Sequence, residues 1–494
     1  MTREPVGVRG VAVRAVLFRG TGDLLPIYAL YGVLFADHGL NTAQISLLLA
    51  IWSVTSFVLE VPSGAWADTV SRRGLLILCC VLQAACFASW MVAPTFAGFA
   101  LGFLLWGMAS ALESGTFEAL IYDDLVARGE PSAYASIMGW ARGAQEGTVL
   151  VAILAAAPLF VWGGYPLVGW VSVGIGVLHT LTAFALPTAP KSISATAVDD
   201  LDDEPNLGTL GPHIVPGPPA GSTDPHGSTG IEQRSARSAD EQPRPDESAS
   251  AGATSGPVDR GTSGDPRRSG GASEVHESGA AEPASAAPSS RYLTMLRTGL
   301  GEALRVRRVR RGVLLGALLY GITAFDEYFG LLAVSGGAST STSALLVGVT
   351  VVGSLVGSLL AGRAEALSAR TLSIALFVAG ILFIAGALAV GVGAGPALLW
   401  IGFLGIGIAY GIDFTVEVVA GARLQDAIEG PARATVTSVS GLLSEVVALA
   451  VFGFVAAATV WLSMSVTIAA LGLVLLATAA VIPTWLPPRR DEAA

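Results

Sequence analysis

Long apolar segments alternate with short polar connectors along most of the chain. Six apolar segments come first, a long polar stretch follows, and six more apolar segments complete the pattern. A helix needs about 20 apolar residues to cross the hydrocarbon core of a bilayer, where it must satisfy its own backbone hydrogen bonds. The pattern therefore predicts an all-α membrane protein with 12 transmembrane helices in two six-helix pseudo-repeats.

The connectors between these segments are short and carry turn residues, which set the boundaries of the predicted spans. We place the spans at residues 11–36, 42–65, 74–93, 96–122, 135–160, 164–187, 312–334, 343–362, 371–392, 396–421, 433–459 and 461–483. The predicted domains are an N-terminal six-helix bundle at 1–187, a linker at 188–290, and a basic juxtamembrane segment with the C-terminal bundle at 291–494. The first apolar run is too long for the core of a cleaved signal peptide, so we expect it to be retained.

The linker is rich in Gly, Pro, Ser, Ala and Asp and nearly lacks aromatic residues. Such a segment buries too little apolar surface to offset the entropy of the chain, so we expect it to be disordered and cytoplasmic. The basic cluster after it is expected to contact anionic headgroups, and it contains Arg305, Arg307, Arg308, Arg310 and Arg311. The sequence leaves open whether the linker only tethers the two bundles or also binds a partner.

Lys and Arg follow a strict alternation outside the linker. They occur in the even-numbered connectors and near the termini, whereas the odd-numbered connectors contain none. This distribution is the positive-inside pattern. It predicts a multi-pass protein of the cell membrane with both termini and the central loop in the cytoplasm.

Composition excludes several classes of protein. Only 13% of the residues are charged, compared with about 25% in a typical soluble protein. The histidines show no metal-ligand spacing, and Cys79, Cys80 and Cys86 share one apolar span, where buried thiols are expected instead of disulfides. No phosphate-binding loop of the form G-x-x-x-x-G-K-[ST] occurs. We therefore expect no enzymatic activity, cofactor, metal or nucleic acid, but a monomer in the lipid bilayer that handles a small-molecule substrate and protons.

The two halves echo each other in their acidic residues. Glu118, Glu130 and Glu146 each match another glutamate 299 positions later, at Glu417, Glu429 and Glu445. Spans four and five thus correspond to spans ten and eleven. Because six crossings separate the repeats, both halves have the same topology and should be related by an axis along the membrane normal, with the pathway between them.

The connector after the second span carries a compact charged motif. Gly64 permits close approach of a neighbouring helix. Asp68 is an anion near a helix end, and Arg72 and Arg73 follow it at headgroup level, four and five residues on.

This motif resembles the signature G-x-x-x-D-x-x-x-R-R of the major facilitator superfamily, a family of membrane transporters. Residues 60–63, 118–123 and 433–438 are similar to the same superfamily. The resemblance implies two bundles that rock about a central site, with Asp68 and Arg72 in a cytoplasmic gate that stabilises the outward-facing state. The drug–proton antiporters of the superfamily differ, because residues 104–115 lack their arginine and residues 139–147 lack their proline.

Two charged pairs lie within predicted spans at a spacing of four. Arg19 and Asp23 share a face of span one, and Arg142 and Glu146 share a face of span five. Either pair could be an internal ion pair that holds the bundle together; we assign this role to Arg142 and Glu146. The resemblance places spans one, four, seven and ten around the cavity, so we assign Arg19 and Asp23 to the candidate substrate or proton site.

Further acidic residues complete this candidate site: Asp326, Glu327, Asp413, Glu417, Glu113 and Glu118. Charges inside a bilayer are costly and mark functional sites. Burial, and a second carboxylate nearby, favour protonation of a carboxylate, as proton coupling requires. Glu113 and Glu118 lie nearer the cytoplasmic mouth, where gating and binding roles are both compatible with the sequence. Acids outnumber bases in this set, so the cavity should accept cationic or neutral amphipathic molecules.

The sequence therefore favours a secondary active transporter that is proton-coupled and exports a small amphipathic or cationic molecule. A proton-driven nutrient importer is the alternative within the same class. A transporter-like membrane sensor or scaffold that acts through the linker is the alternative from another class, and a channel is a weaker third.

Overall fold

The computed structural model describes residues 7–191, 306–428 and 433–489, and all regular structure within them is helical. Linker residues from 192 onwards, Arg305 and Glu429 lie outside the described residues. The backbone of Asp68 is described, but its side chain is not.

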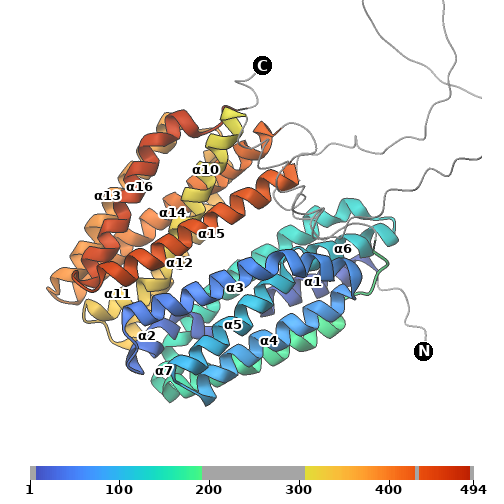
Figure 1. The fold of residues 1–494 in the computed structure, drawn as a ribbon, viewed down its shortest axis with the longest axis horizontal. Helices are drawn as coiled ribbons and strands as arrows, with labels where there is room; N and C mark the ends of the chain where they lie inside the picture. Colours follow the sequence, from blue (N-terminus) through green and yellow to red (C-terminus); the bar gives the residue numbers. More distant parts are fainter. Residues whose placement is uncertain (1–6, 192–305, 429–432, 490–494) are drawn as a thin grey trace, which may run out of the picture. The chain divides into compact units, whose positions relative to one another are not determined.

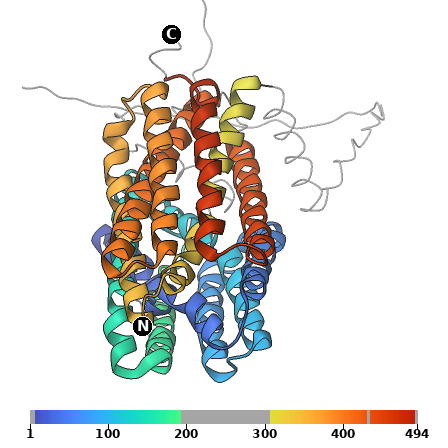
Figure 2. The same cartoon turned by 90° about the vertical axis from the view of Figure 1, so that its left-hand side faces the viewer.

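Within residues 7–191, the structure contains seven α-helices and two 3-10 helices. They are α1 (Val8–Gly22), η1 (Pro26–Ala29), α2 (Tyr31–Asp37), α3 (Thr42–Thr69), α4 (Arg72–Val92), α5 (Phe96–Glu113), α6 (Thr116–Ala127), η2 (Pro131–Ala133) and α7 (Tyr134–Ala185). In the second half follow α10 (Arg307–Ile322), η3 (Thr323–Tyr328), α11 (Phe329–Ser335), α12 (Thr340–Ala364), α13 (Ala369–Val392), α14 (Pro396–Ala427), α15 (Arg433–Ala458) and α16 (Met464–Trp485). Both views show the second-half helices, coloured yellow to red, running lengthwise beside one another (Figure 1, Figure 2).

The helices account for the twelve predicted spans. Ten stretches in the described residues are long and apolar enough to cross a membrane. One of them holds two spans, because α7 runs through a kink at Gly163 and Gly164, and Gly164 has a left-handed φ of 62°. The first span is divided into α1, η1 and α2, each too short to be counted alone. The all-α fold with two six-helix halves is confirmed.

Spans one, four and seven are broken, whereas the sequence pattern predicted uninterrupted segments. In span one, Pro26 has no backbone N–H to donate, and the residue before it, Leu25, is extended. In span four, Gly115 separates α5 from α6 with a left-handed φ of 63°. In span seven, η3 tightens the chain into a 3-10 helix between α10 and α11. These breaks bring polar side chains and backbone into the middle of the bundle.

Helices α12 and α14 contact each other backbone to backbone. A Cβ added to Gly353 would lie 2.0 Å from the carbonyl oxygen of Gly407, and one added to Gly357 would lie 2.0 Å from that of Gly411. Only glycine fits such a contact, the usual way in which membrane helices gain close van der Waals packing. Spans eight and ten are thereby held together along two helical turns.

The described contacts between the halves include several from segments near the odd-numbered connectors, away from the linker. The hydroxyl groups of Ser46 and Tyr328 lie 2.7 Å apart, and both residues are buried. A Cβ on Gly32 would be 3.6 Å from the carbonyl oxygen of Glu327. Deeper in the bundle, Ser53 of α3 donates a hydrogen bond to Glu445 of α15.

Large apolar side chains cover much of the outer surface, as expected of a protein surrounded by lipid. The most exposed tryptophans are Trp162 and Trp461, at 77% and 81%. Each stands at a turn between two spans, and the two are 299 positions apart in the chain. They therefore follow the same repeat as the glutamates, and tryptophan is typical of the membrane–water interface.

Candidate functional site

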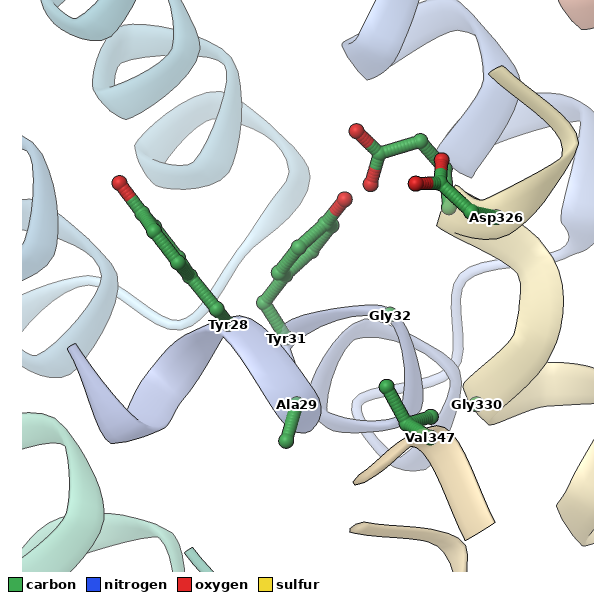
Figure 3. Close-up of a pocket in the computed structure, with 8 residues that line it drawn as sticks. Tyr28, Ala29, Tyr31, Gly32, Asp326, Gly330 and Val347 are labelled. Atoms are coloured by element: carbon green, nitrogen blue, oxygen red, sulfur yellow. The ribbon is translucent and has the colours of Figure 1, made fainter. Parts of the chain in front are cut away.

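A small pocket lies between the broken first and seventh spans (Figure 3). Its lining consists of Tyr28, Ala29, Tyr31, Gly32, Asp326, Glu327, Gly330 and Val347. The first half supplies two tyrosines and the second half supplies two carboxylates. Figure 3 shows Tyr28 and Tyr31 extending to the same side of the first-half ribbon, with Asp326 across from them. The breaks create this site, because they turn residues of η1 and η3 towards each other.

The first-half wall is held by aromatic stacking and by hydrogen bonds. The ring of Tyr28 stacks on Trp106 with centroids 5.2 Å apart and planes inclined by 6°. The Tyr28 hydroxyl donates to Asp23 at 3.1 Å, and the amide of Gln145 donates to the other Asp23 oxygen at 2.5 Å. Asp23 therefore lies behind the pocket wall, where it positions a tyrosine. Sequence reasoning missed Tyr28, Tyr31 and Gln145, although hydroxyl groups beside a proline within an apolar run were an available signal.

The two carboxylates of the second half have different surroundings. Asp326 accepts a hydrogen bond of 2.6 Å from the hydroxyl of Tyr410 on α14. The neighbouring Glu327 also lines the pocket, but its carboxylate has neither a hydrogen-bond donor nor a cation beside it in the described part of the chain. The structure thus leaves Glu327 available to a ligand and holds Asp326 in place.

Asp413 and Glu417 lie on α14, outside the pocket lining. Asp413 is fully buried, and neither of its carboxylate oxygens has a hydrogen-bond partner among the described residues. One oxygen of Glu417 is buried without a partner as well. A buried carboxylate without a donor or a counter-charge is costly in its ionised form.

Arg19 does not pair with Asp23, despite their spacing of four. Helix α1 ends at Gly22, and Asp23 adopts φ −112° and ψ 14°, so the helical register that would align the two side chains is lost. Arg19 instead donates to Glu113 at 2.7 Å and to Glu118, one on each side of the break in span four. Its guanidinium also lies 4.5 Å from the ring centroid of Phe117. This arginine therefore joins span one to both parts of span four.

The charged motif after span two takes part in a buried ion pair. Arg72 contacts Asp123 at 2.5 Å, and their side chains are only 2% and 1% exposed. Arg73 donates to the carbonyl of Phe184 at 2.6 Å. Gly64 lies within α3, and the gate role assigned to Asp68 stays a prediction because its side chain is not described.

Arg142 and Glu146, the predicted ion pair, are not brought within ion-pair distance. Arg142 is exposed and Glu146 is half-buried on α7. A helical spacing of four permits a pair but does not enforce one, because each side chain can turn towards other charges.

An ion pair outside the membrane spans and the question of a metal site complete the description of the charged groups. Outside the spans, Arg128 binds Asp124 at 2.6 Å, and this hydrogen bond raises the pKa of the guanidinium, so the pair stays ionised. No group of three or more His, Cys, Asp or Glu side chains in the described ranges could hold a metal ion.

Comparison with known proteins agrees with this architecture. The family model of the Major Facilitator Superfamily matches residues 15–439. No curated protein sequence matches the chain. Among solved structures, a mutant form of the nucleoside transporter NupG has a TM-score of 0.62 at 11% identity and covers 96% of this chain and 98% of its own.

Two other solved structures are similar. A bacterial homologue of the human lysosomal transporter Spinster, in an inward-facing and unoccupied conformation, has a TM-score of 0.55 at 15% identity, covering 98% of this chain and 96% of its own. A D-xylose–proton symporter has a TM-score of 0.56 at 12% identity, covering 97% of both chains. These likenesses show the fold, and the family match covers most of the sequence. The chain belongs to the Major Facilitator Superfamily and is a multi-pass membrane transporter of small molecules, not an enzyme.

Proposed function

We propose that this chain is a proton-coupled secondary transporter that binds a small amphipathic or cationic molecule in the pocket between spans one and seven and exports it. The observation that carries the proposal is Glu327, a carboxylate that lines the pocket without a partner among the described residues. The two-bundle division at residues 187 and 291, with the linker between, is part of the same proposal.

The chemistry of the lining supports a cationic or amphipathic substrate. Tyr28 and Tyr31 offer aromatic faces, which attract cations, and Glu327 offers a negative charge. No Lys, Arg or His is among the pocket-lining residues that the structure describes. The pocket would therefore hold a monocation or a neutral amphipathic molecule and would repel an anion.

Proton coupling is supported by the carboxylates that lack cations. Asp326 accepts hydrogen bonds from neutral donors, the Tyr410 hydroxyl and backbone N–H groups, and Asp413 has no donor among the described residues. Such groups exchange protons more readily than carboxylates clamped by arginine. A proton and a cation would compete for the same negative charge at Glu327, which favours exchange of one for the other.

The orientation supports export. The positive-inside pattern assigns the linker side to the cytoplasm. The Ser46–Tyr328 hydrogen bond and the Gly32–Glu327 contact lie on the opposite side, so the pocket would be sealed from the outside and loaded from the cytoplasm. Import is the alternative, and two similar structures are described as a nucleoside transporter and a D-xylose–proton symporter. Direction is decided by flux measurements.

The direct test is flux in liposomes that contain the purified full-length protein, under an imposed pH gradient. The panel contains tetraphenylphosphonium, a quaternary ammonium ion, a nucleoside and a pentose. We expect Glu327→Gln to reduce binding and flux of the cations by about tenfold, because an amide keeps the shape of the side chain but loses the charge. Glu365→Gln, an exposed glutamate on the linker side, is the matched control. If the protein transported only the nucleoside or the pentose, in the direction of proton flow, the proposal of cation export would be wrong and the alternative of proton-driven import would take its place.

Asp326→Asn tests the proton. An amide cannot release a proton, so we expect flux of this variant to become insensitive to the imposed pH gradient, while wild-type flux grows with the gradient. Exchange of labelled for unlabelled substrate without a gradient should persist, because it requires no net proton movement. An unchanged response of Asp326→Asn to the gradient would remove Asp326 from the coupling mechanism.

A further inference from the structure

Two glycines lie where spans one and seven meet at the pocket. A Cβ added to Gly32 would lie 3.6 Å from the carbonyl oxygen of Glu327, and one added to Gly330 would lie 3.7 Å from the carbonyl oxygen of Ala29. The two contacts are reciprocal, because the corresponding residues of the two halves are 298 positions apart in both cases. Both glycines line the pocket. The absent side chains at this crossing therefore leave space that the pocket uses.

The cavity beside the crossing is small. Its volume is about 30 Å³, which is room for about two or three water molecules. Val347 of α12 also lines it, and in Figure 3 this side chain lies on the other side of Gly32 from Asp326. An ammonium group, –NH₃⁺, fits a space of this size. A nitrogen that carries three methyl groups would overlap with the lining.

The polar groups of the pocket favour the same kind of ion. The carboxylate of Glu327 has no hydrogen-bond donor beside it in the described part of the chain. A primary ammonium group offers three N–H donors, which form strong charge-assisted hydrogen bonds with a carboxylate, whereas a quaternary ammonium ion offers none. Aromatic faces such as that of Tyr28 attract both kinds of ion and do not decide between them.

We propose that Gly32, Gly330 and Val347 select the substrate by the size of its cationic group, and that the substrate is a primary amine in its ammonium form. The nitrogen lies in the space left by the two glycines and donates hydrogen bonds to Glu327 of the second half. The apolar or aromatic body of the molecule lies against the tyrosines of the first half. This inference rests on the proposed function, because it requires that a cation binds in this pocket.

A pair of ions that differ only at the nitrogen tests the size limit. Binding of 2-phenylethylammonium and of its N,N,N-trimethyl derivative is measured by calorimetry on the purified full-length protein. We expect the primary ion to bind tenfold or more tightly, since a single methylene group in an enclosed pocket changes discrimination by about 10–200-fold. Equal binding of the two ions, or tighter binding of the trimethyl ion, would overturn this inference alone. Binding of neither ion would refute the proposed function together with it.

Two variants should shift the preference in opposite directions. Gly32→Ala adds a methyl group that meets its neighbours at ordinary contact distances of 3.6 and 3.7 Å, so the backbone need not move; it should weaken binding of the primary ion about tenfold by filling the cavity. Val347→Ala removes two methyl groups and should strengthen binding of the trimethyl ion about tenfold.

Matched controls lie on α12 away from the pocket. Gly362→Ala adds a methyl group where nothing lies within 4 Å, and Val352→Ala truncates a side chain that is 42% exposed. Both should bind the two ions like the wild type. A gain of binding in Val347→Ala cannot result from poor folding, so this variant keeps the test decisive if Gly32→Ala folds badly. Identical preferences in Val347→Ala and Val352→Ala would contradict the size limit.

Discussion

The two halves of the molecule differ in whether their buried carboxylates are paired with arginine. In the first half, arginines meet carboxylates inside the bundle, as Arg72 meets Asp123 and Arg19 bridges Glu113 and Glu118. Each pair joins elements that are distant in the chain. The first half thus behaves as a scaffold whose charges neutralise one another.

In the second half, four acids on spans seven and ten have no cation within ion-pair distance in the described residues: Asp326, Glu327, Asp413 and Glu417. Packing there relies on glycine, since α12 and α14 touch through Gly353, Gly357, Gly407 and Gly411. Neutral close contacts hold this half together and leave its carboxylates available to protons and ligands. Close glycine contacts also occur in the first half, where a Cβ on Gly107 of α5 would lie 2.7 Å from the carbonyl oxygen of Trp52 on α3, so the two halves differ in how their charges are paired and not in the use of glycine.

The largest effect should come from breaking the charged contact of the first half. Arg72→Ala leaves Asp123 buried and ionised, which should cost about 3–5 kcal/mol of unfolding free energy. The neighbouring Arg73→Ala loses one hydrogen bond to a carbonyl and should cost about 1 kcal/mol. Unfolding in mixed micelles of a mild detergent and dodecyl sulfate measures both. Equal losses would mean that burial of the pair contributes nothing.

A smaller loss is expected for the glycine contact of the second half. Gly357→Ala places a methyl group against the backbone of α14 and should cost about 1–3 kcal/mol through overpacking. Gly362→Ala on the same helix, where an added Cβ meets nothing within 4 Å, is the matched control and should be neutral or stabilising. The same unfolding assay applies. If both variants behave alike, the close approach of α12 to α14 is not a source of stability.

The smallest effect is expected at Asp413. The change Asp413→Asn retains the shape of a buried side chain that has no ion-pair partner among the described residues, so it should alter the unfolding free energy by about 1 kcal/mol or less. This small loss would contrast with the large loss expected for Arg72→Ala, although Arg72 and Asp413 are both ionisable residues in buried positions. A loss as large as that of Arg72→Ala would reveal a cationic partner for Asp413 and would remove the difference between the halves.

The sequence was sufficient for the fold because the bilayer constrains it so strongly. Twelve apolar segments, the turn residues between them and the repeat of 299 positions specify two similar six-helix halves, and the structure confirms this fold. The breaks in spans one and four left a weak signal, at Pro26 and Gly115. The break in span seven had no proline at all, and only the acidic pair Asp326 and Glu327 within an apolar run marked it.

The site was less accessible to sequence reasoning. Carboxylates in apolar spans were recognisable one by one, because their burial is costly wherever they lie. Their partners depend on contacts between distant segments: Arg19 reaches span four, and Arg72 reaches Asp123, 51 positions away. Spacing along one helix suggested Arg142–Glu146 as an ion pair, but spacing alone does not determine the direction in which a long side chain extends.

The glycine contact between α12 and α14 constrains how these two helices can move relative to each other. Because their backbones are in direct contact, we expect a displacement of α14 to be transmitted to α12. Helix α12 in turn rests on α7, where a Cβ on Gly348 would lie 3.1 Å from Leu154. The glycine contact therefore connects the carboxylate-bearing helix α14, through α12, to α7 of the first half.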